Sequence, residues 1–251
     1  MSKPILGIIG GGQLGSMLAT AAKKIGIKTV IFCDDQDAPA QSFADKFICG
    51  KYDDQNIIDE FINAIDIATF EFENIPYETL NKINNIKSVL PNPSINKIVQ
   101  NRLFEKDYIN KLNIRTTQYV SIKNEKEIYI NKDFLPGLLK TTTLGYDGKG
   151  QYKINLVDDL KNLNIDFTKE YILEKLIKLK KEISVVITRF GNQKYEIYDP
   201  IENVHEDQIL KYSKIPANIS EKISSKSKIW ATIIAEELKF IGTLCVEFFI
   251  D

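Results

Sequence analysis

The stretch LLKTTTLGYDGKGQYKI, residues 138–154, places a glycine-rich tip between two runs that are typical of β-strands. The Asp147-Gly148 pair between such runs is a hairpin signal. The tip contains the glycines Gly145, Gly148 and Gly150. A tip so poor in side chains can fold over phosphates and offer them backbone N–H groups, with Lys140 on the incoming strand balancing their charge. An ordinary exposed hairpin explains the same pattern, and the spacing leaves both interpretations open.

The segments that follow this hairpin predict a mostly antiparallel sheet. Strands are expected at 171–177, 183–190, 194–205, 208–216 and 242–251. Two helical patterns interrupt them, at 156–163 and 223–240. The second helix leads directly into the last strand.

On the N-terminal side of the hairpin the sequence predicts a helix over 95–112, with Ser94 as its cap. A strand at 116–122 and a helix at 124–132 follow it. The stretch LPNPSINK contains two prolines and breaks the preceding pattern, so a domain boundary is expected near residue 92.

The first ninety residues alternate apolar strand-like runs with helical patterns, which predicts a right-handed parallel α/β domain. Gly10, Gly12 and Gly15 form a G-x-G-x-x-G turn after the first run. Asp34 and Asp35 follow about twenty residues later, as a dinucleotide-binding pattern requires. The amides at such a helix start attract other anions equally well.

The overall composition predicts a soluble globular protein of the reducing cytoplasm. The net charge of −1 argues against nucleic acid or an anionic membrane as a partner. No apolar run is long enough to span a membrane, and the N-terminus does not resemble a signal peptide. The three cysteines are Cys33, Cys49 and Cys245. Their scattered positions favour buried thiols over a disulfide framework.

Seven segments in chain order resemble the ATP-grasp superfamily, and within it the 5-(carboxyamino)imidazole ribonucleotide synthases. They are GIIGGGQLGSML (7–18), TFEFENIP (69–76), PNPS…VQNRLFEK (91–106), KTTTLGYDGKGQ (140–151), LEKLIKLKKEISV (173–185), PIENVHEDQIL (200–210) and GTLCVEFF (242–249). The resemblance implies a Rossmann-like pre-ATP-grasp α/β domain at 1–92 and an ATP-grasp domain at 93–251, with a lid subdomain at 115–173.

The activity that the resemblance implies is that of an ATP-dependent carbon–nitrogen ligase of purine biosynthesis. ATP, bicarbonate and 5-aminoimidazole ribonucleotide would give the N-carboxylated ribonucleotide, ADP and phosphate, through carboxyphosphate and with Mg²⁺. The glycine-rich loop and Lys140 would neutralise charge on the moving phosphoryl group and exclude water.

The resemblance assigns one set of residues to ATP. They are Arg102, Lys106, Lys140, Gly145, Tyr146, Asp147, Gly148, Lys149, Gly150, Gln151, Glu174, Lys175, Leu176, Ile177, Glu182 and His205. Within this set, residues 145–151 would cover the phosphates, residues 174–177 would read the adenine edge, and Glu182 would accept from the ribose hydroxyls. His205 would lie beside the nucleotide.

Simpler explanations exist for several of these residues. Arg102 and Lys106 also fit a solvated helix face, and Glu182 also fits a surface ion pair with a neighbouring lysine. His205 is the only histidine, and a lone histidine is usually structural.

The resemblance also assigns substrate and metal residues. Gly12, Gln13, Leu14 and Glu73 would bind the ribonucleotide, with the glycine turn facing its phosphate instead of a dinucleotide. Tyr146 and Asp147 would lie near the imidazole and, with Lys140, would form the catalytic set. Glu247 would be the first of two acidic Mg²⁺ ligands, on a strand expected to be buried.

The sequence departs from the family pattern in two places. Leu144 stands where a second glycine is usual, which predicts a stiffer loop. The Asn-Glu strand that would carry the second Mg²⁺ carboxylate, and the small domain after it, do not follow residue 251. Their absence predicts an open sheet edge and suggests a complementing C-terminal segment as a partner, beside a homodimer.

Three other functions stay open at this point. The chain could be a non-catalytic nucleotide-binding half of a split or truncated enzyme, or a different ATP-grasp ligase. A nicotinamide-dependent oxidoreductase is supported only by the opening glycines and Asp34, and it leaves GYDGKGQ and ENVHEDQIL unexplained.

Overall fold

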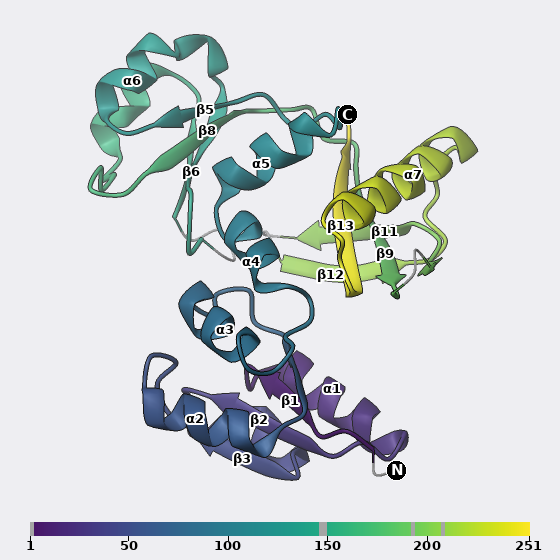
Figure 1. The fold of residues 1–251 in the computed structure, drawn as a ribbon. Helices are drawn as coiled ribbons and strands as arrows, with labels where there is room; N and C mark the ends of the chain where they lie inside the picture. Colours follow the sequence, from purple (N-terminus) through teal and green to yellow (C-terminus); the bar gives the residue numbers. More distant parts are fainter. Residues whose placement is uncertain (1–2, 146–149, 192–193, 207–208) are drawn as a thin grey trace. The chain divides into compact units, whose positions relative to one another are not determined.

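The computed structural model describes residues 3–145, 150–191, 194–206 and 209–251 (Figure 1). The chain forms two compact units, Met1–Lys97 and Ile98–Asp251. Each unit has its own β-sheet structure and its own buried core.

The first unit contains a parallel sheet with the strand order β3-β2-β1-β4. Its strands are β1 (Leu6–Ile9), β2 (Thr29–Cys33), β3 (Lys46–Cys49) and β4 (Ile67–Phe70). Its helices are α1 (Gln13–Lys24), the 3₁₀ turn η1 (Pro39–Phe43), α2 (Gln55–Ala64) and α3 (Tyr77–Asn84). This architecture confirms the predicted parallel α/β fold.

Helices cover both faces of this sheet because side chains alternate along each strand. Ile8 and Ile31 lie in a cluster with residues of α1 and η1. Their neighbours Ile9 and Phe32 lie in the larger cluster of the opposite face, which includes Phe61 of α2. Figure 1 shows α1 on the other side of the sheet from α2 and α3.

The prediction of a single helix over 95–112 is wrong, because two helices occupy this region. They are α4 (Pro93–Val99) and α5 (Arg102–Lys111). Asn101 separates them, since its side-chain oxygen accepts hydrogen bonds from the amides of Leu103 and Phe104 and so starts a new helix. Ser94 lies inside α4, and its own amide donates to Asn92. The division between the two units also falls inside α4, and the domain boundary near 92 stays a prediction.

The second unit begins with an antiparallel sheet of order β5-β8-β6-β7. Its strands are β5 (Tyr119–Ile122), β6 (Gly137–Thr141), β7 (Gln151–Ile154) and β8 (Tyr171–Lys175). The helix α6 (Glu125–Ile130) and the 3₁₀ turns η2 (Lys132–Phe134) and η3 (Val157–Asn162) belong to the same region. The pairing of β6 with β7 confirms the predicted hairpin, although residues 146–149 of its tip lie outside the described part of the chain.

The second sheet of this unit is also antiparallel, as predicted. Its strands are β9 (Lys181–Arg189), β10 (Tyr195–Ile197), β11 (Ile201–Glu206), β12 (Ile209–Lys214) and β13 (Gly242–Ile250). The helix α7 (Glu221–Glu237) packs against β9 and β13 (Figure 1). Because Ile183, Val185 and Ile187 of β9 are buried, the alternate residues of the strand face the other side.

Two expectations about burial are wrong. Strand β13 alternates between exposed and half-buried residues, so Glu247 is exposed and not part of a buried run. Within the described residues, β13 pairs only with β9, and one of its edges is therefore open. Of the three thiols, Cys33 is buried whereas Cys49 and Cys245 are exposed.

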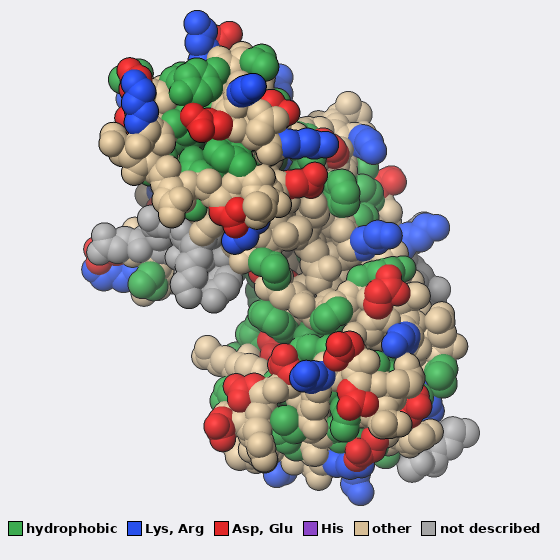
Figure 2. Space-filling model, turned by 90° about the vertical axis from the view of Figure 1, so that its left-hand side faces the viewer, with side chains coloured by type: hydrophobic (Ala, Val, Ile, Leu, Met, Phe, Trp, Pro, Cys, Tyr) green, Lys and Arg blue, Asp and Glu red, His purple; other side chains and the backbone are tan. Residues whose placement is uncertain are grey.

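Charged side chains of both signs lie on the face of the molecule drawn in Figure 2, where acidic and basic ones are interspersed. In the described part of the chain, no helix has the length and apolar character needed to cross a membrane.

Candidate nucleotide site

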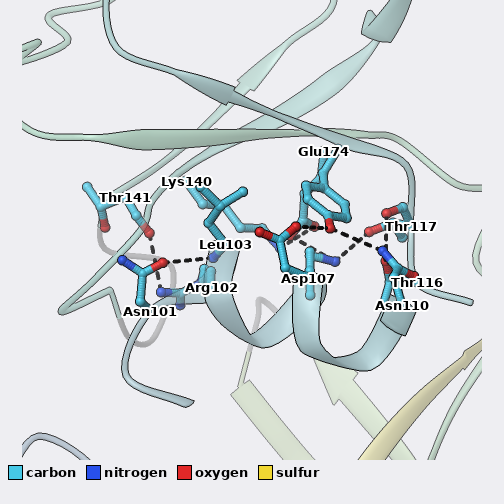
Figure 3. Close-up of polar contacts among 12 residues, drawn as sticks. Asn101, Arg102, Leu103, Asp107, Asn110, Thr116, Thr117, Lys140, Thr141 and Glu174 are labelled. Atoms are coloured by element: carbon cyan, nitrogen blue, oxygen red, sulfur yellow. Dashed lines mark hydrogen bonds and ion pairs between the residues drawn. The ribbon is translucent and has the colours of Figure 1, made fainter. Parts of the chain in front are cut away.

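A buried ion cluster lies between α5 and the sheet that contains β6 and β8 (Figure 3). Lys140 of β6 and Glu174 of β8 lie diagonally on one face of this sheet, because Lys140 pairs with Ile172 and Leu138 pairs with Glu174. The Lys140 ammonium is 3.0 Å from Glu174 Oε2, and the Lys106 ammonium of α5 is 3.2 Å from Oε1. One carboxylate therefore holds two lysines that were both predicted to bind ATP.

Burial makes this cluster electrostatically strong. The side chain of Glu174 is 7% exposed, against 16% for Lys106 and 20% for Lys140. Burial alone would raise the pKa of Glu174, but Lys140 and Lys106 together hold it below its usual value. Burial lowers the pKa of Lys106, and Glu174 opposes that change. With all three groups charged, the cluster carries one net positive charge and suits an anionic ligand.

Lys106 has further partners that the sequence analysis missed. Its ammonium donates to Thr117 Oγ1 at 2.8 Å and lies 5.7 Å from the centre of the Tyr119 ring. The Tyr119 hydroxyl in turn donates to Asp107 at 2.6 Å and accepts from Nδ2 of the Asn110 side chain at 3.1 Å. Helical spacing places Lys106 and Asn110 on one side of α5, but nothing local in the sequence indicates that Tyr119 would meet them.

Arg102 binds backbone carbonyls at the base of the glycine-rich hairpin. Its guanidinium donates to the carbonyl of Gly145 at 2.7 Å and to that of Thr141 at 3.4 Å. Its backbone amide donates to Thr142. The structure thus places Arg102 next to the predicted phosphate loop, with its guanidinium bound to backbone oxygens.

The two ends of the hairpin tip have backbone conformations that favour glycine. Gly150 has a φ of +71°, and a Cβ there would lie 2.8 Å from Thr141 Oγ1. Leu144 has a φ of +58°, a left-handed conformation that costs a residue other than glycine about 1 kcal/mol. The left-handed backbone at residue 144 explains why glycine is usual where this chain has Leu144. The predicted residues Tyr146, Asp147, Gly148 and Lys149 lie outside the described residues, whereas Gln151 pairs with Lys140 at the start of β7.

The segment predicted to read adenine leaves one amide available. The amides of Lys175 and Leu176 donate to the carbonyls of Gln118 and Pro136, both at 2.9 Å. The amide of Ile177 has no acceptor within the described residues. A ligand edge placed here would therefore meet the Ile177 N–H together with the carbonyl oxygens of the segment.

A second polar group lies on the face of β9 and β11 that points away from the core. His205 Nδ1 is 2.8 Å from Glu182 Oε2. Asn203, which pairs with Glu182 across the strands, donates to Ser184 Oγ at 3.0 Å. The suggested pair between Glu182 and its neighbour Lys181 does not form, because Lys181 binds Glu202 at 2.8 Å.

Glu247 belongs to the same face of this sheet. It pairs in register with Ser184, which is two residues from Glu182 on β9. The described residues contain no group of three or more histidine, cysteine or acidic side chains that could hold a metal ion. Glu247 therefore offers one exposed carboxylate and not a complete metal site.

The glycine turn of the first unit is partly filled by a residue that the sequence analysis did not select. Glu71, directly after β4, accepts a hydrogen bond from the amide of Gly12 at 2.9 Å. A Cβ on Gly10 would lie 2.7 Å from the same carboxylate oxygen. The amides of Gln13 and Leu14 begin α1 and remain the donors for an anion, while Glu73 is exposed. The sequence signal that could have selected Glu71 is its place beside Glu73 in the alternating stretch FEFEN, residues 70–74.

Comparison with known proteins places these features in a family. Residues 107–251 match the ATP-grasp domain, and residues 2–100 match the ribonucleotide synthetase preATP-grasp domain. The N5-carboxyaminoimidazole ribonucleotide synthase of Brucella melitensis is 36% identical over 250 residues, which cover 98% of this chain and 69% of that protein. The chain belongs to the N5-carboxyaminoimidazole ribonucleotide synthase family.

Solved structures of the family agree with this assignment. The Staphylococcus aureus synthetase complexed with ADP is 35% identical, with a TM-score of 0.93 over 99% of this chain and 67% of that chain. The Aspergillus clavatus synthase in complex with ADP and 5-aminoimidazole ribonucleotide is 25% identical, with a TM-score of 0.86 over 98% of this chain and 66% of that chain. The chain spans about two thirds of the length of the curated synthases that it matches.

Family membership changes the interpretation of the opening glycine turn. The turn lies in a domain that matches the preATP-grasp model of ribonucleotide synthetases. The glycines Gly10, Gly12 and Gly15 therefore belong to a domain of the ribonucleotide synthetase preATP-grasp type. Their spacing is not evidence for a nicotinamide cofactor.

Proposed function

We propose that this chain binds ATP and uses it to carboxylate 5-aminoimidazole ribonucleotide with bicarbonate. The observation that carries the proposal is the buried cluster of Lys106, Glu174 and Lys140 at the glycine-rich hairpin. Its net positive charge suits a polyphosphate. The ADP and 5-aminoimidazole ribonucleotide held by the Aspergillus clavatus relative support the same substrates here.

The described residues suggest how the reaction would proceed. Lys140 and the amides of the hairpin would bind the ATP phosphates while the γ-phosphoryl group passes to a bicarbonate oxygen, which releases ADP and forms carboxyphosphate. The amine of the ribonucleotide would then attack the carboxyl carbon, expel phosphate and lose a proton. Of the catalytic set, Tyr146 and Asp147 stay predictions from the sequence.

The remaining nucleotide contacts would come from the adenine segment 174–177 and from the Glu182–His205 pair. Ile177 would donate its amide to the adenine edge, and Glu182, oriented by His205, would accept from the ribose hydroxyls. In the first unit, the amides of Gln13 and Leu14 at the start of α1 would bind the ribonucleotide phosphate.

Magnesium fits the residues present only in part. Mg²⁺ in phosphate-transfer sites is commonly held by one or two carboxylates together with substrate phosphates. Glu247 supplies one exposed carboxylate, which is the smaller of these two numbers. The ion would supply charge neutralisation at the phosphates. The cytoplasmic location, the homodimer and the complementing C-terminal segment stay predictions.

Phosphate release from ATP tests the proposed reaction. With Mg²⁺ and bicarbonate present, we expect release by the 251-residue chain to increase when 5-aminoimidazole ribonucleotide is added. ATP binding without ribonucleotide-dependent release would instead favour the second candidate, a nucleotide-binding half. The single carboxylate that Glu247 offers in the described residues is the observation that favours this candidate.

The proposed ribose contact has a specific consequence. We expect Glu182→Gln to weaken ATP binding about tenfold, since a charged acceptor contributes about 1.5–3 kcal/mol to a hydrogen bond. Binding of 2′,3′-dideoxy-ATP should change less than about twofold, because it lacks the hydroxyls. Calorimetric titration measures both, with Glu206→Gln, an exposed residue at the end of β11, as the matched control. Equal losses for both nucleotides would show that Glu182 does not contact the ribose.

A further inference from the structure

We propose that Lys106 and the Glu174 side chain are positioning residues, which together fix the ammonium of Lys140 for the nucleotide phosphates. Lys106 itself does not contact ATP. This inference rests on the proposed phosphate contact of Lys140. It differs from the sequence prediction, which placed Lys106 among the residues that bind the nucleotide.

The first argument is the number of contacts at each ammonium. Lys106 has three: Thr117 Oγ1, Glu174 Oε1 and the face of the Tyr119 ring. An ammonium has three N–H donors, so Lys106 would have to give up a partner to bind a phosphate. Lys140 has one described polar partner, Glu174 Oε2, and keeps donors for a ligand.

The second argument is the charge that Glu174 shares. A buried carboxylate with Lys140 as its only counter-ion would hold that lysine tightly, and a phosphate would have to compete for it. Lys106 neutralises the other oxygen of the same carboxylate at 3.2 Å. Glu174 can then orient Lys140 without withdrawing its charge from the ligand.

The third argument is the support behind Lys106. Figure 3 shows Asp107, Asn110 and Thr117 close together near Glu174. Lys106 belongs to this group, because its ammonium donates to Thr117. The Tyr119 hydroxyl donates to Asp107 and accepts from the Asn110 side chain, and these two hydrogen bonds fix the ring that lies over the ammonium. Such a frame suits a group that stays in place during binding.

A double-mutant cycle separates a positioning role from direct contact. The dissociation constants of ATP and of adenosine are measured by calorimetry for the unaltered chain, Lys106→Met, Glu174→Gln and the double variant. We expect Lys106→Met to weaken ATP binding about tenfold, the scale of one charged hydrogen bond, and adenosine binding less than about twofold. In the Glu174→Gln background the same change should cost ATP less than about threefold. Lys111→Met, exposed at the end of α5, is the matched control.

Two results would overturn the inference. A tenfold loss of ATP binding that persists in the Glu174→Gln background would make Lys106 a direct phosphate ligand. Equal losses for ATP and adenosine would make its role purely structural. Failure of the proposed nucleotide site looks different, because the unaltered chain would then bind no ATP at all. Failure of the proposed reaction alone would leave ATP binding, and with it this test, unchanged.

Thr117→Val tests the inference without altering a charge, and it serves if Glu174→Gln does not fold. The change removes the hydroxyl that holds Lys106. We expect ATP binding to weaken about threefold while adenosine binding stays constant, because Lys106 keeps its charge but loses one of the partners that fix its position. Unchanged or tighter ATP binding would contradict a positioning role, because a freed Lys106 would then be acting as a ligand.

Discussion

Replacement of Lys140 by methionine is expected to raise the dissociation constant for ATP by about 10- to 100-fold. A charged hydrogen bond contributes about 1.5–3 kcal/mol, and the methionine keeps the length of the side chain without the charge. Lys140 is the lysine of the cluster that keeps donors for a ligand as far as the described residues go, since its polar partner among them is Glu174 alone. Calorimetric titration with ATP measures the effect.

Two controls make the result for Lys140 specific. Lys140→Arg keeps the charge and should recover part of the lost affinity. Lys153→Met, an exposed lysine on the paired strand β7, should leave ATP binding unchanged. If Lys140→Met bound ATP as tightly as the unaltered chain, the phosphates would have to lie elsewhere, and the proposed site would be wrong.

Replacement of Phe61 by alanine is expected to lower the free energy of unfolding of the first unit by about 3–5 kcal/mol. Phe61 of α2 is fully buried, and its ring centre lies 5.4 Å from that of Phe32 of β2. The ring also packs so closely on β1 that a Cβ at Gly7 would lie 2.6 Å from it. Neighbouring side chains cannot fill the space that the ring would leave, and a cavity results.

Urea unfolding followed by circular dichroism measures this loss. Phe43→Ala is the matched control, because Phe43 of η1 is 47% exposed. It should cost less than about 1 kcal/mol. A loss of similar size in both variants would contradict the assigned core of the first unit.

The regular parts of the fold were accessible from the sequence because they depend on local patterns. Buried apolar runs separated by helical patterns predicted the parallel sheet β3-β2-β1-β4, and Asp147-Gly148 predicted the β6–β7 hairpin. The break between α4 and α5 was missed, although Asn101 is a strong helix cap. Burial of β13 was overestimated, because an edge strand with one open face can have the same apolar composition as a central strand.

The candidate site likewise contains residues that the sequence could predict and partners that it could not. The resemblance to the family selected Lys106, Lys140 and Glu174, but it did not reveal that one carboxylate joins the two lysines. Contacts between residues far apart in the chain, such as Glu71 with Gly12 and Tyr119 with Asp107, depend on how strands and helices pack. No local pattern encodes that packing, so only the structure could reveal these partners.

The most direct test of the central claim is a calorimetric titration of the 251-residue chain with Mg²⁺-ATP and, separately, with NAD. The claim is that the nucleotide site lies at the Lys106–Glu174–Lys140 cluster of the second unit, and that the glycine turn of the first unit takes no dinucleotide. We predict binding of one ATP per chain, weakened by Lys140→Met, and no binding of NAD. Binding of NAD without binding of ATP would contradict the account.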